Sequence, residues 1–66
     1  MYKPKHVVRG LSPEGVDHEW SGCGWVDLGR GHRYTEHEAE RVVLDANISQ
    51  TDFIVYRALA GSPVHD

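Results

Sequence analysis

The segment from Tyr34 to Val43 constrains the fold most strongly, because it predicts where a helix begins and which face that helix buries. Thr35 is a preferred helix-capping residue, and Glu38 is placed to reach back to the Thr35 amide and complete a capping box. Apolar residues then recur with helical spacing at Ala39, Val42, Val43 and Ala46. We therefore expect a helix from about Glu36 to Ala46, ended by Asn47 in a left-handed conformation.

Extended segments are predicted on both sides of this helix. Lys5 to Arg9 has β-branched residues at its centre, and Val16 to Trp20 alternates between apolar or aromatic and acidic residues. Ser12-Pro13-Glu14-Gly15, between them, has the composition of a type I turn and closes a hairpin. Gly24 to Leu28 is either a third short strand or a continuation of the second strand after a bulge. Phe53 to Leu59 is the final strand, and its few polar positions predict a central place in the sheet.

This order of elements predicts an α+β fold of the ββαβ type. One helix packs on one face of a small antiparallel sheet of three strands, or four if Gly24 to Leu28 counts separately. Residues 1–59 form the single domain, and residues 60–66 form a flexible tail. The expected core contains Val7 or Val8, Trp25 or Val26, Leu28, Ala39, Val42, Val43, Ile48, Ile54 and Tyr56. The sheet face without a helix is expected to be exposed, or covered by a partner or a second copy in a homodimer.

Chain length and cysteine content limit how the domain is stabilised and where it works. A chain of 66 residues is near the lower limit for unaided folding, and such domains often depend on a metal, disulfides or a partner. Cys23 is the only cysteine, so no disulfide forms within the chain, and a lone thiol fits a reducing compartment. No apolar run is long enough to span a bilayer, and we expect a cytoplasmic protein without a membrane partner.

The charge distribution favours a protein partner over nucleic acid. The net charge is −3, and residues 10–29 contain four acidic residues but no Lys or Arg. Binding to a phosphate backbone requires clustered basic residues, whereas an acidic surface complements a basic surface on another protein. The alternative is that the acidic residues only keep a small domain soluble.

Two tryptophans lie among these acidic residues and suggest a binding surface. Aromatic residues are enriched at protein interfaces and carry much of the binding energy there. The candidate partner-binding residues are Asp17, Glu19, Trp20, Trp25 and Asp27. The alternative is that both tryptophans belong to the core.

Metal binding and nucleophilic catalysis are the chemical alternatives. Zinc accepts the ligand types offered by His18, Cys23, His32 and His37, although their spacing matches no common zinc-finger pattern. Cys23, flanked by two glycines, has His18 or His32 as a candidate base but lacks a third orienting residue. We favour surface histidines, a structural Cys23, no cofactor and no catalytic site.

Four segments together resemble a layout found in small proteins encoded by phages and prophages. They are Val7-Val8-Arg9, Glu19-Trp20-Ser21-Gly22, Gly24-Trp25-Val26-Asp27, and Tyr34-Thr35 followed by Glu38-Ala39-Glu40. The similarity covers roughly residues 6–59, and the histidine content and Cys23 depart from the usual pattern. The resemblance implies a host-takeover or anti-defence factor that occupies a surface of a host protein and inhibits or modulates it. A zinc-stabilised domain and a nucleic-acid-binding module are the alternative functions.

Overall fold

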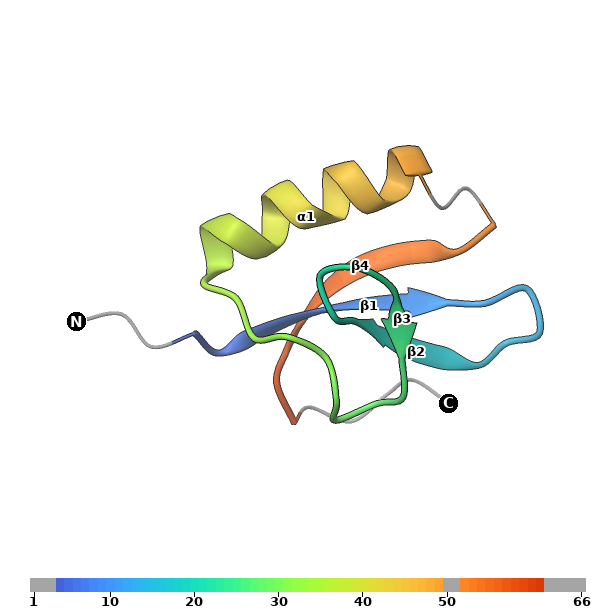
Figure 1. The fold of residues 1–66 in the computed structure, drawn as a ribbon, viewed down its shortest axis with the longest axis horizontal. Helices are drawn as coiled ribbons and strands as arrows, with labels where there is room; N and C mark the ends of the chain where they lie inside the picture. Colours follow the sequence, from blue (N-terminus) through green and yellow to red (C-terminus); the bar gives the residue numbers. More distant parts are fainter. Residues whose placement is uncertain (1–3, 50–51, 62–66) are drawn as a thin grey trace.

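The computed structural model describes residues 4–49 and 52–61 (Figure 1). These residues form one antiparallel sheet of four strands and one helix, which confirms the predicted α+β class. The elements in chain order are β1 (His6–Leu11), β2 (Asp17–Trp20), β3 (Trp25–Val26), α1 (Glu36–Ser49) and β4 (Ile54–Leu59). The Trp25–Val26 segment is therefore a strand of its own.

The strands are arranged in the order β3-β2-β1-β4, so β1 is central and β4 is an edge strand. The prediction that the last strand is central was wrong. Its apolar sequence does not reflect burial on both faces, since Ile54 is 66% exposed and Leu59 is 55% exposed. Ala60, where the predicted tail begins, still donates a hydrogen bond to the Lys5 carbonyl, and residues 62–66 lie outside the described part of the chain.

The β1–β2 hairpin closes through the predicted type I turn. The Gly15 amide donates to the Ser12 carbonyl at 2.9 Å, and Gly15 has a positive φ of 85°. The Ser12 amide then donates to the Val16 carbonyl at 2.9 Å, which completes a three-residue hairpin loop with a glycine bulge. Glycine adopts this left-handed conformation without the steric cost that a side chain would add.

Helix α1 begins as the sequence predicts but ends later. The Thr35 amide donates to Oε1 of Glu38 at 3.1 Å, and the Glu38 amide donates to Oγ1 of Thr35 at 3.3 Å. This reciprocal pair is the predicted capping box. The predicted end at Ala46 was wrong, because the helix continues through Asn47 to Ser49. Asparagine is only a weak helix terminator, and neither glycine nor proline follows it within the helix.

Helix α1 covers one face of the sheet, over β4 and β1 (Figure 1). Val8, Val55 and Ala39 form the buried centre of this layer. Half-buried apolar and aromatic side chains pack around it: Trp20, Trp25, Tyr34, Val42, Val43 and Phe53. Leu28 and Ile54 are not core residues as predicted, being 41% and 66% exposed. Leu28 lies in the turn after β3, and Ile54 begins the edge strand on the face opposite the helix.

The face opposite the helix is not simply uncovered. Val7 is only 2% exposed there, and Arg9 and Glu19 are also buried. Part of this cover comes from the segment between β3 and α1, where the Gly31 amide donates to Oε1 of Glu19 at 3.0 Å. The prediction that apolar groups on this face are exposed or need a partner was therefore wrong for Val7. The predicted core residues Val26 and Tyr56 are half-buried, and the side chain of Ile48 lies outside the described part of the structure.

Candidate functional site

The aromatic cluster, defined as His18, Trp20, Trp25 and Phe53, is the first candidate binding surface. Trp20 and Trp25 face each other across β2 and β3, with their ring centroids 5.0 Å apart in an edge-to-face arrangement. Phe53 stacks on Trp25 with a ring-centroid distance of 4.9 Å and an interplanar angle of 2°. The ring centroids of His18 and Phe53 are 5.7 Å apart. All four side chains are half-buried. The tryptophans therefore pack against the core, and both residues remain partly exposed to solvent.

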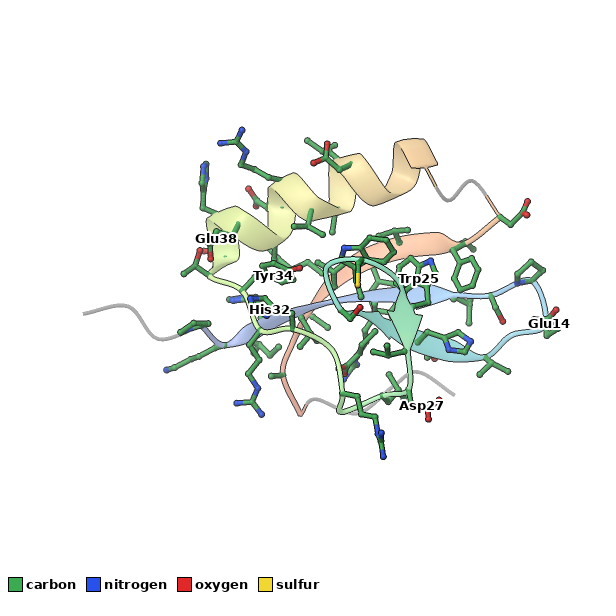
Figure 2. The ribbon with its side chains drawn as sticks, viewed as in Figure 1. Glu14, Trp25, Asp27, His32, Tyr34 and Glu38 are labelled. Atoms are coloured by element: carbon green, nitrogen blue, oxygen red, sulfur yellow. The ribbon has the colours of Figure 1, made fainter. Side chains whose placement is uncertain are left out.

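Trp25 lies at the centre of this cluster (Figure 2). Its ring packs on the backbone of Gly10 in the central strand. Its indole Nε1 is buried and has no hydrogen-bond partner among the described residues. An unsatisfied buried donor costs about 1–3 kcal/mol, so the ring's position is maintained by its aromatic and backbone contacts.

The five predicted partner-binding residues do not form one surface. Trp20 and Trp25 lie on the helix side of the sheet, whereas Asp17 and Glu19 alternate with His18 and Trp20 and therefore lie on the opposite side. Glu19 is only 3% exposed, so the prediction that it contacts a partner conflicts with its burial. Asp27 is exposed in the turn after β3 (Figure 2).

The two acidic residues of β2 instead belong to a polar network on the face opposite the helix. Nε of Arg9 lies 3.8 Å from Oε2 of Glu19, and both side chains are about 5% exposed or less. The Tyr56 hydroxyl donates to Oδ1 of Asp17 at 2.6 Å. Burial, followed by the hydrogen bond to Asp17, raises the pKa of Tyr56. This network was not predicted from the sequence, although opposite charges on paired strands could have indicated it.

The four candidate zinc ligands are not brought together. Among the described residues, no group of three or more His, Cys, Asp or Glu side chains is arranged to hold a metal ion. His18 packs on Phe53, and His32 packs edge-to-face on Tyr34 with a ring-centroid distance of 4.6 Å. Cys23 is exposed, with its sulfur 3.8 Å from the Ser21 hydroxyl, and His37 is exposed on α1.

His32, Tyr34 and Glu38 lie near the start of α1 (Figure 2). Burial and the nearby Glu38 and Cys23 raise the pKa of Tyr34. Hydrogen bonds from Thr35 lower the pKa of Glu38. The hydrogen bonds of the Glu38 carboxylate therefore cap α1.

A second surface lies between α1 and the edge strand β4. Glu40, Val43 and Leu44 of α1 and Arg57 of β4 line a groove of about 500 Å³. Nη1 of Arg57 donates to Oε1 of Glu40 at 2.6 Å and lies 3.4 Å from Oε2 of Glu36. This groove was not predicted from the sequence, because the last strand was expected at the centre of the sheet.

Comparison with known proteins adds no relative. No protein-family model matches the chain, and no curated protein or solved structure matches it significantly. Among the described residues, no helix combines the length and the apolar character needed to cross a membrane.

Proposed function

We propose that this protein is a small non-enzymatic binding module that occupies a surface of another protein through its aromatic cluster. The observation that carries this proposal is the half-buried group of His18, Trp20, Trp25 and Phe53, whose rings contact one another beside the helix. Tryptophan is enriched among residues that dominate binding energy, and rings already fixed by packing lose little entropy on binding.

The charges around the aromatic cluster favour a partner with a basic surface. Glu14 is exposed in the hairpin turn and Asp27 is exposed after β3, so acidic side chains lie in the loops on either side of the cluster strands (Figure 2). Residues 10–29 contribute no Lys or Arg. Complementary charge speeds association and selects against acidic partners, which include nucleic acids.

A bacterial host protein is the partner that we propose. The resemblance to small phage and prophage proteins supports a bacterial host protein as the target, inhibited or modulated in an anti-defence or host-takeover role. The single cysteine fits action in the reducing cytoplasm of the host cell. The mechanism requires no cofactor, because the bound surface of the target is blocked by occupancy alone.

Affinity capture from bacterial lysate tests this proposal. The tagged wild-type protein is compared with Trp20→Ala and His18→Ala, which reduce the aromatic cluster, and with Arg41→Ala, an exposed substitution on α1 outside the cluster. Circular dichroism and thermal unfolding establish that each variant is folded. We expect one protein to be retained in stoichiometric amount by the wild type and by Arg41→Ala, and lost from both cluster variants. Retention that is equal for all four proteins, or no stoichiometric protein at all, would contradict the proposal.

A further inference from the structure

The edge strand β4 directs every second backbone unit away from the sheet. The Ala60 amide donates to the Lys5 carbonyl at 2.7 Å, in the same register that pairs His6 with Leu59 and Val8 with Arg57. Hydrogen-bonded and non-hydrogen-bonded pairs alternate along an antiparallel ladder. The N–H and C=O groups of Ile54, Tyr56 and Ala58 therefore point toward β1. Those of Val55 and Arg57 point outward.

These outward groups are open for pairing. In the described sheet β4 pairs only with β1, and no backbone group of residues 4–49 or 52–61 bonds the outer side of Val55 or Arg57. An open edge of this kind is a template for another strand unless charges, proline or a bulge block it. Arg57 supplies a charge here, but its guanidinium is already held by Glu40 and Glu36 on the helix side.

Exposed aliphatic side chains lie on both faces beside this edge. Ile54 is 66% exposed on the face opposite the helix. Leu44 is 65% exposed and lines the groove between α1 and Arg57 on the helix face. A strand added at the edge would therefore bury apolar surface above and below the new hydrogen bonds.

We infer that β4 pairs antiparallel with β4 of a second copy of this chain, so that two sheets join into one. The register that uses both outward residues places Val55 of one copy opposite Arg57 of the other, with the two-fold axis at Tyr56. Each of these two pairs exchanges two backbone hydrogen bonds, which gives about four bonds in all. In the same register Ile54 of one copy faces Ala58 of the other.

The charged groups along this edge are of both signs, so a second copy related by a two-fold axis sets unlike charges against each other. Each copy brings one arginine and two carboxylates, from Glu36 and Glu40, to the same side of the edge. A two-fold axis places the arginine of each copy near the carboxylates of the other, and this register keeps the two Arg57 side chains from standing directly opposite each other. The groove of one copy then meets that of the other, and Leu44 from both copies fills the joined space.

The size of the domain supports the same occupant. Among the described residues, the buried hydrophobic side chains are Val7, Val8, Ala39 and Val55, which is a small core even for a chain of this length. Small domains commonly gain stability from oligomerisation. The aromatic cluster includes no residue of β4, but Phe53 directly precedes Ile54, so the proposed partner surface adjoins the dimer interface at the start of this strand.

Analytical ultracentrifugation and amide hydrogen exchange test this inference on the full chain. We expect a concentration-dependent species of twice the 7.4 kDa monomer mass. The Arg57 amide should be protected in that species and exchange rapidly on dilution, whereas the inward Tyr56 amide stays protected throughout.

Arg57→Pro removes the outward N–H and is compared with Arg57→Ala, which removes the same ion pairs but keeps the N–H. The loss of two symmetry-related bonds should raise the dimer dissociation constant of Arg57→Pro about thirtyfold relative to Arg57→Ala.

Leu44→Glu provides a test that leaves the strand unchanged. It places two carboxylates in the joined groove and should weaken the dimer at least as clearly as Arg57→Pro does. A wild-type protein that stays at 7.4 kDa at every concentration would overturn the inference. So would a dimer whose Arg57 amide exchanges rapidly, or one unaffected by both Arg57→Pro and Leu44→Glu, because the copies would then associate through another surface.

Discussion

The indole ring of Trp25 lies directly on the backbone of Gly10, in space that a side chain at position 10 would occupy. A β-carbon built on Gly10 would stand 2.5 Å from Cη2 and 2.7 Å from Cζ3 of that ring. Phe53 stacks on Trp25 and Trp20 meets it edge-on, so the ring cannot move without disturbing both neighbours. The glycine in the central strand is therefore required by the aromatic cluster packed above it.

Gly10→Ala should destabilise the protein by about 1–3 kcal/mol, because the new methyl group overpacks the site and displaces Trp25. Denaturant unfolding measures the loss, and the tryptophan emission should shift as the indole becomes more exposed. Gly24→Ala is the matched control, since a β-carbon there meets no atom within 4 Å and the backbone has no positive φ. Its effect should stay within about 0.5 kcal/mol. Equal effects at the two positions would contradict this account of Gly10.

Thr35→Ala should cost about 1 kcal/mol of stability at neutral pH, because it removes the hydroxyl that caps the Glu38 amide. The Thr35 amide, and then the Thr35 hydroxyl, lower the pKa of Glu38 by donating hydrogen bonds to its carboxylate, and Thr35→Ala removes only the hydroxyl bond. The ionised carboxylate contributes stability above its ordinary pKa of 4.5, and the part carried by the hydroxyl is the part that differs between the two proteins. That contribution is lost as the pH falls through the lowered value. The stability difference between wild type and Thr35→Ala, measured by thermal unfolding, should therefore shrink in acid. Arg41→Ala, an exposed substitution on α1 at a residue that does not shift the pKa of Glu38, should show no such dependence.

The local elements could be predicted from the sequence because short-range chemistry determines them. Thr35 and Glu38 form the predicted capping box, and Ser12 to Gly15 form the predicted turn. Each depends on residues within four positions of one another. The α+β class follows from the order of these elements, since one amphipathic helix must cover one face of the sheet.

The order of the strands and the burial of polar groups could not be predicted in the same way. The apolar run from Phe53 to Leu59 is compatible with a central or an edge strand, and only pairing with β1 decides which. Glu19 alternates with tryptophan and histidine in the sequence, which suggests a solvent-facing residue. Its burial depends on Arg9 across the strand and on Gly31 from a distant loop. Such long-range contacts are not encoded by periodicity.

Glu19→Ala should destabilise the protein by about 3 kcal/mol or more, because it leaves the buried Arg9 without this carboxylate and the Gly31 amide without its acceptor. Glu36→Ala is the matched control, since Glu36 also pairs with an arginine but is 66% exposed. An exposed ion pair contributes about 0–1 kcal/mol. Urea unfolding of the two variants compares them directly. A cost for Glu19→Ala as small as that for Glu36→Ala would show that the buried pair does not stabilise the sheet.

Tyr56→Phe should reduce stability by about 1 kcal/mol at neutral pH, because it removes the hydrogen bond from the Tyr56 hydroxyl to Asp17. Burial and this bond raise the pKa of Tyr56 above its ordinary value of 10.0. The folded state therefore holds the phenolic proton more tightly than the unfolded state, and the stabilisation is present below pH 10 and lost as the pH rises through the raised value. Unfolding measured from neutral to alkaline pH should show the wild type and Tyr56→Phe converging in stability above pH 10.

Tyr34→Phe is the control. The Tyr34 hydroxyl makes no hydrogen bond among the described residues, so this variant should match the stability of the wild type at neutral pH. A constant gap between wild type and Tyr56→Phe across this range would show that the hydroxyl stabilises the fold by packing alone.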